Sequence, residues 1–311
     1  MSDATLPPLP LTVIAGYLGS GKTTLINKLL ADAGGRRIMV LVNDFGELAI
    51  DAELIAARGG DTISLSNGCV CCAIGGDLFQ AFAKALDASP RPDHLVIEAS
   101  GVAEPDRIAN FARAEPELRL DLIVTLVDAL NARTQADDPL IGRTLHQQFQ
   151  SAGLLLITKD QLAGQEQATG LASWLSTLCP ETPILRGEMD LEILLGPETN
   201  PPPSVDQKHP HDHDHSHEDM YERWSFSAPL APDVEALRVV LENLPTGILR
   251  LKGVANSTPE PVEFHTAGRH INITPAPGVT THGLRVVAIG LAGNLPTDEL
   301  AARFETLATS A

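Results

Sequence analysis

The sequence has few cysteines, few aromatic residues and little basic charge. Its 311 residues include four cysteines, 4% aromatic residues, and 22 Lys plus Arg against 40 Asp plus Glu. So few cysteines exclude a disulfide-rich scaffold, and a formal charge of −18 argues against nucleic-acid and anionic-membrane partners. No apolar run approaches the roughly 18 residues of a membrane helix, and the first residues lack a signal-peptide pattern, so we expect a cytoplasmic protein.

A glycine-rich stretch follows the first apolar run. The residues from Gly16 to Thr24, Gly-Tyr-Leu-Gly-Ser-Gly-Lys-Thr-Thr, match the phosphate-binding P-loop, between an expected buried strand at 11–15 and an expected helix at 25–31. Lys22 is expected to reach the β- and γ-phosphates, and the Thr23 hydroxyl to bind Mg²⁺. Glycines let the backbone N–H groups point at phosphate oxygens. The residues expected to bind nucleotide here are Gly16, Gly19, Ser20, Gly21, Lys22, Thr23 and Thr24.

An acidic loop follows the second apolar run, 37–42. It reads Asn-Asp-Phe-Gly-Glu, and acidic groups at the carboxyl end of a parallel strand lie on the ligand side of the sheet. Asp44 is therefore a candidate for Mg²⁺ or its water network, and Glu47 for a second metal. A solvated acidic loop is the alternative.

Another buried strand is expected to end at Glu98, followed by Ala-Ser-Gly. This Glu-x-x-Gly step is what a nucleotide-sensing switch requires. Glu98 is expected to act on Mg²⁺ or its water shell, and the Gly101 amide on the γ-phosphate.

Three of the four cysteines lie within four positions, at Cys69, Cys71 and Cys72. As thiolates they supply soft ligands to Zn²⁺ or Co²⁺, and Glu47, water or a partner side chain could complete an exchangeable site. A redox pair and a purely structural role are the alternatives. Cys179 is expected to pack in the core.

Further strands are expected at 121–127 and 153–157, so strands alternate with helices as in a doubly wound parallel sheet. The last strand runs into Thr158, Lys159 and Asp160, at the place of the base-recognition motif of GTPases. The final Asp of that motif is replaced by Gln161. Guanine preference therefore stays open, with Asp160 as the carboxylate that a small loop shift would bring to the base.

These motifs together resemble the CobW family of P-loop GTPases, which are metallochaperones related to the nickel-insertion GTPases of urease and hydrogenase maturation. The similarity covers nearly the whole chain, and Cys-x-Cys-Cys is its most specific part. The resemblance implies GTP hydrolysis coupled to delivery of a transition metal to a client metalloprotein. It also implies a cargo site at the three cysteines, with Glu47 as a candidate further ligand. Slow turnover is expected, because no arginine finger or water-orienting glutamine can be assigned.

A stretch rich in Pro, Asp and His separates the two expected domains, and its alternating histidines favour binding of transition metals as a reservoir, concentrator or sensor. A merely hydrophilic linker is the alternative. These histidines are His209, His211, His213, His215 and His217.

The sequence thus predicts an α/β chain with three parts. They are a P-loop GTPase domain at 1–197 with a doubly wound, mostly parallel sheet, a linker at 198–220, and a small α+β domain at 221–311. In the last domain Arg250 and Lys252 are expected on a solvated strand face, with contact to an acidic partner or to the nucleotide domain as the alternative. A P-loop kinase and a zinc buffering or storage protein are the rival functions, and whether the chain forms a homodimer is left open.

Overall fold

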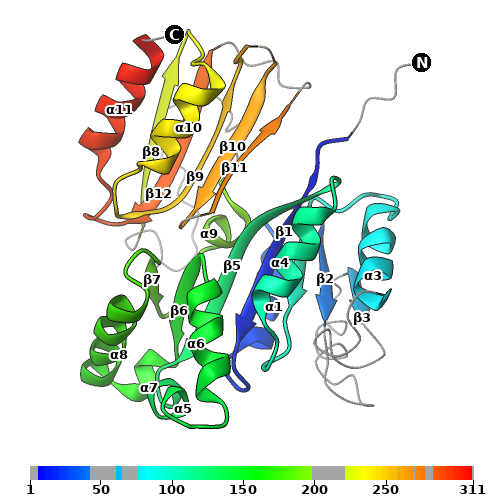
Figure 1. Ribbon diagram of the computed structural model, residues 1–311, viewed down its shortest axis with the longest axis vertical. Coiled ribbons are helices and arrows are strands. Elements are labelled where there is room, and N and C mark those ends of the chain that lie inside the picture. The colour runs from blue at the N-terminus through cyan, green and yellow to red at the C-terminus, as the bar shows by residue number, and fades with distance from the viewer. Residues whose placement is uncertain are drawn as a thin grey trace. The chain divides into compact units, whose positions relative to one another are not determined.

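The computed structural model describes residues 6–42, 61–64, 76–197, 221–258, 260–268, 270–276 and 283–309. The chain divides into two compact units, Met1–Leu194 and Leu195–Ala311, each with its own sheet and core (Figure 1). Within the described ranges, no helix is both long and apolar enough to cross a bilayer. The predicted linker at 198–220 lies outside these ranges, and the predicted domain boundaries remain predictions.

The first unit is built on a seven-stranded sheet in the order β3-β2-β4-β1-β5-β6-β7, and every pairing of described strands is parallel. Its central strands are buried on both faces, which explains their continuous apolar runs. The prediction of a doubly wound parallel sheet is confirmed. The strands are β1 (Leu9–Gly16), β2 (Ile38–Val42), β3 (Asp61–Ser64), β4 (His94–Glu98), β5 (Leu118–Asp128), β6 (Leu154–Thr158) and β7 (Ile184–Arg186).

Helices cover both faces of this sheet. Helices α3 and α4 pack on β1, β2 and β4, and α6 and α8 pack on β5 and β6. Helix α1 lies on the opposite face, where Leu25 lines a cavity with Leu126 and Leu156. The helices are α1 (Lys22–Ala31), α3 (Gly76–Leu86), α4 (Pro105–Ala114), α5 (Ala132–Ala136), α6 (Gly142–Ser151), α7 (Asp160–Ala163), α8 (Gln165–Leu178) and α9 (Leu191–Leu195).

Two buried polar side chains bind each other in the core of this unit. The Thr12 hydroxyl donates to the Leu194 carbonyl oxygen at 3.1 Å, and His94 Nε2 lies 2.9 Å from the same hydroxyl oxygen. Because the single hydroxyl proton points at Leu194, His94 is the donor to Thr12, which fixes its proton on Nε2. The contact joins β1, β4 and α9. The expected core position of Cys179 is also confirmed, since that side chain is buried.

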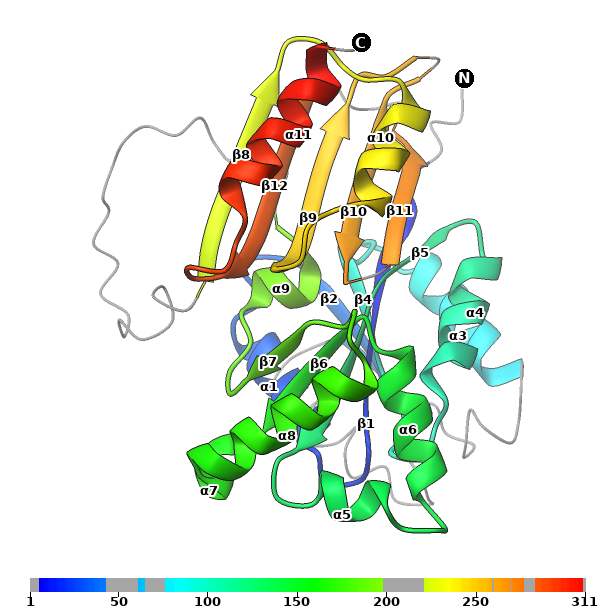
Figure 2. The same cartoon turned by 60° about the vertical axis from the view of Figure 1, so that its left-hand side comes forward.

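The second unit is an antiparallel sheet in the order β11-β10-β9-β12-β8. Helices α10 and α11 cover one of its faces (Figure 2), with Leu237, Phe264 and Phe304 in the shared core. The expected α+β architecture is confirmed, but strand β11 was not expected. The elements are β8 (Tyr221–Ala228), α10 (Val234–Glu242), β9 (Ile248–Ala255), β10 (Val262–Ala267), β11 (His270–Pro275), β12 (Leu284–Leu291) and α11 (Thr297–Thr309).

The expected solvated face at Arg250 and Lys252 is wrong. Arg250 is 2% exposed, and Lys252 pairs with Glu263 on the neighbouring strand at 3.1 Å. The reason is that β9 is buried along nearly its whole length, at seven of its eight residues. Both faces of the strand are therefore removed from water, so alternation does not predict which of its residues reach water.

Candidate nucleotide-binding site

The P-loop joins the central strand β1 to helix α1. Its backbone turns through left-handed conformations at Gly16, with φ of 136°, and at Gly21, with φ of 98°. A Cβ atom on Gly16 would lie 2.6 Å from the Leu126 carbonyl oxygen, so a larger residue would displace β5. The first turn of α1 contains no acidic residue. No carboxylate from the first turn of the helix itself therefore competes with an anion for its positive end.

Lys22 lies at the start of α1 with its side chain folded back over the loop. It is 8% exposed, and its Nζ atom donates to the Gly16 carbonyl oxygen at 3.0 Å and approaches the Tyr17 carbonyl oxygen at 3.5 Å. These contacts hold the ammonium at the loop expected to wrap the phosphates, which suits the predicted role of Lys22.

Thr23 and Glu98, both predicted to act on Mg²⁺, lie together. Glu98 ends β4 and is buried, and the Thr23 hydroxyl donates to its Oε1 atom at 3.3 Å. A hydroxyl and a carboxylate are oxygen donors of the kind that Mg²⁺ prefers. The donor set therefore fits the predicted ion. Asp44, the third predicted residue, lies outside the described residues.

Gly101 packs directly on the P-loop. A Cβ atom at this position would lie 2.6 Å from Leu18 Cδ2 and 2.8 Å from the Leu18 backbone nitrogen. Only glycine allows this approach. The loop after β4 is thus held beside the phosphate-binding loop, as its predicted role as a γ-phosphate sensor requires.

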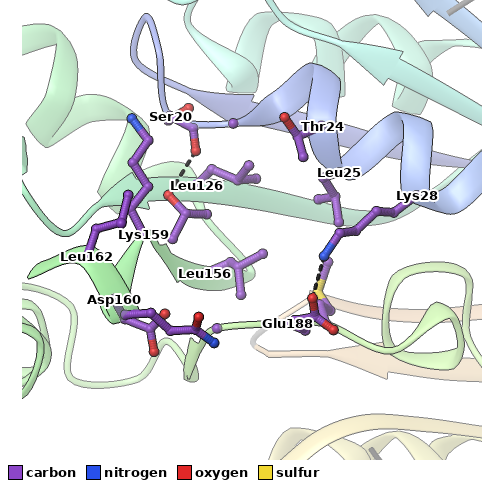
Figure 3. A pocket seen from close by; sticks show the side chains of 15 residues that line it. Ser20, Thr24, Leu25, Lys28, Leu126, Leu156, Lys159, Asp160, Leu162 and Glu188 are labelled. Carbon is purple, nitrogen blue, oxygen red and sulfur yellow. Dashed lines mark hydrogen bonds and ion pairs between the residues drawn. The ribbon is translucent and has the colours of Figure 1, made fainter. Parts of the chain in front are cut away.

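A cavity of about 360 Å³ lies beside the P-loop, between α1 and the loops after β6 and β7 (Figure 3). Leu126 and Leu156 supply apolar walls, and the Thr158 hydroxyl donates to the Ser20 carbonyl oxygen at 2.8 Å. The volume is in the range of a small-molecule site. The hydrogen bond from Thr158 to Ser20 joins the predicted base-recognition motif to the P-loop.

Lys159 is held in place by an ion pair with Asp128, the last residue of β5. Its backbone is left-handed, with φ of 57°, and its Nζ atom donates to Asp128 Oδ2 at 2.9 Å. Burial raises the pKa of Asp128, but hydrogen bonds from Lys159, the Asn131 side chain and the Leu130 amide outweigh it and lower the pKa overall. Since the folded-state pKa is below the unfolded one, the pair stabilises the fold at neutral pH and is lost only in acid.

Asp160 and Gln161 both line the cavity, but they differ in exposure. The Asp160 carboxylate is half-buried, with oxygens 3.6 and 3.8 Å from the position that a Cβ atom on Gly187 would take, whereas Gln161 is exposed. The carboxylate thus lies against the loop after β7. This placement favours Asp160 over Gln161 as the group that would contact a base.

Three residues of the site were not predicted. Asp128 could have been found, because it ends a buried strand just as Glu98 does. Lys28 of α1 and Glu188 of the loop after β7 form an ion pair across the cavity (Figure 3). They are far apart in sequence, and no motif marks either one.

The predicted transition-metal ligands lie outside the described residues. Within the described ranges, no group of three or more His, Cys, Asp or Glu side chains is arranged to hold a metal ion. The predicted ligands are Glu47, Cys69, Cys71, Cys72, His209, His211, His213, His215 and His217.

The loop after β1 and the loop after β6 thus meet at one edge of a parallel sheet. P-loop NTPases bind phosphates at the first of these loops, and those of the GTPase type bind the base at the second. The first unit is a nucleotide-binding domain of this class.

The chain belongs to the CobW/HypB/UreG family of P-loop GTPases. Residues 10–186 match the family model described as "CobW/HypB/UreG, nucleotide-binding domain". Residues 221–308 match the "Cobalamin synthesis protein cobW C-terminal domain". Together the two models account for both units, and the predicted family is confirmed.

Several named proteins are similar to this chain. A protein of Pseudomonas aeruginosa named "Zinc chaperone CobW" is 33% identical over 309 residues, which cover 85% of this chain and 81% of the relative. A protein of the same name from Sinorhizobium is 32% identical over 60% of this chain, and the match spans 62% of the relative's own length. The Zn(II)-bound YjiA GTPase of E. coli is similar at 25% identity with a TM-score of 0.47, over 97% of this chain and 99% of that one.

The Asp128 network leads to a test of the base-binding loop. We expect Asp128→Asn to weaken binding of a fluorescent GDP about tenfold, because Lys159 would lose a charged acceptor. The dissociation constant would be measured at pH 7.5. Asp137→Asn, at an exposed position of the same region, is the matched control and should bind like the unaltered protein. Equal affinity in both variants would contradict a role for Asp128.

Proposed function

We propose that this protein is a GTP-hydrolysing metallochaperone. In this proposal it binds a transition metal, Zn²⁺ or Co²⁺, at Cys69, Cys71 and Cys72 and passes it to a client metalloprotein under nucleotide control. Reduced thiolates need a reducing compartment, so a cytoplasmic location is part of the proposal.

The observation that carries the proposal is that β4, β2 and β3 end side by side at the edge of the sheet where the P-loop lies. Ile14 of β1 lies opposite Glu98 of β4, Glu98 opposite Val42 of β2, and Val42 opposite Ser64 of β3. All four strands are parallel, so they end at the same edge as the P-loop. The segment with Asp44 and Glu47 follows Val42 directly in the chain, and the segment with the cysteines follows Ser64. The chain therefore enters both segments beside the nucleotide site.

The described residues support the hydrolytic part. Lys22 would neutralise charge on the phosphates, and Thr23 and Glu98 would orient the oxygens around Mg²⁺. When bound, Mg²⁺ screens the charge of the β- and γ-phosphates. Turnover is expected to be slow, because the sequence offers no assignable arginine finger or water-orienting glutamine.

The names of the relatives support Zn²⁺ as the cargo. Two of them are called zinc chaperones, and the solved structure of a third holds zinc. Thiolates with a carboxylate suit Zn²⁺ and Co²⁺ alike, so Co²⁺ stays in the proposal on chemical grounds. The alternating histidines, His209 to His217, would act as a separate, less selective reservoir.

Replacing the P-loop lysine tests the enzymatic activity. We expect Lys22→Ala to lower GTP hydrolysis at least about 100-fold, because the ammonium is the cationic group held at the loop. Phosphate release would be measured at saturating GTP. Lys84→Ala removes an exposed lysine of α3 and should leave the rate unchanged. Hydrolysis at the full rate in Lys22→Ala would contradict a P-loop mechanism.

Asp160→Asn tests which group contacts the base. Guanine offers two N–H donors to a carboxylate, whereas xanthine offers one donor and one acceptor, which an amide matches better. We expect Asp160→Asn to bind GDP about tenfold more weakly and to gain affinity for xanthosine diphosphate. Gln161→Ala is the comparison at the neighbouring position. A loss of GDP binding in Gln161→Ala alone would assign base recognition to Gln161.

Metal competition tests the coupling of cargo to nucleotide. The protein lacking residues 209–217 would compete with a chromophoric chelator for Zn²⁺ and Co²⁺, first with Mg²⁺-GDP and then with a Mg²⁺-GTP analogue. We expect the metal to bind at least about tenfold more tightly with the GTP analogue than with GDP. Two ligands that favour the same conformation strengthen each other's binding by the same factor.

Two cysteine variants complete this experiment. The tightening should vanish in Cys71→Ser and persist in Cys179→Ser, because Cys179 is buried in the core of the first unit and donates to the Phe149 carbonyl oxygen. Equal metal affinity with GDP and with the analogue would overturn nucleotide control.

A further inference from the structure

Helix α6 carries a buried amide that reaches the loop after β4. Gln148 is 1% exposed, and its Nε2 atom donates to the carbonyl oxygens of Gly101 at 3.0 Å and Ala103 at 3.1 Å. Both amide hydrogens are thus directed at a single loop. The orientation of the amide follows from chemistry, because the reversed amide would place its oxygen against two carbonyl oxygens.

This arrangement is more than packing. Gln148 Oε1 is buried and accepts no hydrogen bond from the described residues, which costs free energy that an apolar side chain of similar shape would avoid. The backbone oxygen of Gln148 accepts from the Thr125 hydroxyl of β5 at 3.0 Å. The residue is therefore fixed to the central sheet on one side and to the loop on the other.

The loop after β4 lies between the P-loop and helix α6. On one side Gly101 packs against the Leu18 backbone of the P-loop, and on the other its carbonyl oxygen is bound by Gln148. In a trans peptide the carbonyl oxygen and the next amide hydrogen point in opposite directions. Binding the Gly101 oxygen toward α6 therefore directs the Val102 amide away from α6, so the bond sets the orientation of the loop peptides.

We propose that Gln148 is a positioning residue that holds the 101–103 loop in the orientation needed to detect a γ-phosphate. It acts through the loop and touches no nucleotide. The inference rests on the proposed function, since it assigns to Gln148 the setting of the γ-phosphate sensor. Because Gln148 connects this loop to α6, a change in the loop on binding a γ-phosphate would also act on α6.

The same helix offers a matched control. Ser151 Oγ lies 2.6 Å from Asp106 Oδ2 of α4, the helix that follows the loop. Ser151→Ala therefore removes a contact between α6 and α4 and leaves the loop carbonyl groups bound to Gln148. A variant that loosens α6 without touching the loop is thus available.

The test compares triphosphate and diphosphate binding. In Gln148→Met, which keeps the shape of the side chain and loses both donors, we expect affinity for a Mg²⁺-GTP analogue to fall about tenfold and affinity for GDP to stay unchanged. Hydrogen exchange of a peptide covering residues 99–104 should differ between the two nucleotides in the unaltered protein, and the difference should disappear in Gln148→Met. Ser151→Ala should keep both the affinity ratio and the exchange difference.

Each result has one meaning. Equal losses for GDP and the analogue in Gln148→Met, or an unchanged ratio with the exchange difference intact, would overturn the role of Gln148 and leave the proposed function standing. An unaltered protein that binds neither guanine nucleotide would overturn the proposed function itself. A Gln148→Met protein that fails to fold would be replaced by Gln148→Leu, judged by the same ratio and the same exchange difference.

Discussion

Close contact with the P-loop backbone is the constraint on which the rest of the first unit depends. The loop's own lysine and two separate segments contact its main chain. Lys22 donates to the Gly16 oxygen, Thr158 donates to the Ser20 oxygen, and Gly101 packs on the Leu18 nitrogen. A change in the path of the loop would therefore disturb the expected phosphate, base and sensor regions together. The left-handed glycines are needed because only they let the backbone take this path.

The parallel sheet brings distant residues to the same edge. Asp128 and Thr158 lie opposite each other at the ends of β5 and β6, and Glu98 ends β4 on the other side of β1. Each strand end adds one polar group to the site, and hydrogen bonds between neighbouring loops fix their relative positions. Helix α6 extends this arrangement, because Gln148 binds the loop after β4 from the face opposite to α1. The loop after β4 and helix α6 are thereby connected by two hydrogen bonds.

Much of the site could be predicted from sequence because local chemistry determines it. The P-loop, Glu98, Gly101 and the Thr158–Lys159 motif are short patterns whose residue types are required by phosphate and base binding. Asp128 was missed although it ends a strand, because no neighbouring residue forms a motif with it. Gln148 was missed because its partners lie 45 and 47 residues away in the chain. Strand β11 was missed although its sequence, His-Ile-Asn-Ile-Thr-Pro, alternates polar and apolar residues; it is a short, half-buried strand at the edge of its sheet.

The sequence by itself determined the alternation of parallel strands with helices in the first domain, the phosphate-binding loop and the family. Apolar runs, glycine positions and motif spacing are local properties that need no three-dimensional information. Only the tertiary structure decided which strands are neighbours, which carboxylate supports Lys159, which of Asp160 and Gln161 is less exposed, and that Arg250 is buried. These features depend on contacts between residues far apart in the chain. Such contacts arise from the packing of the whole sheet, and no local pattern encodes them.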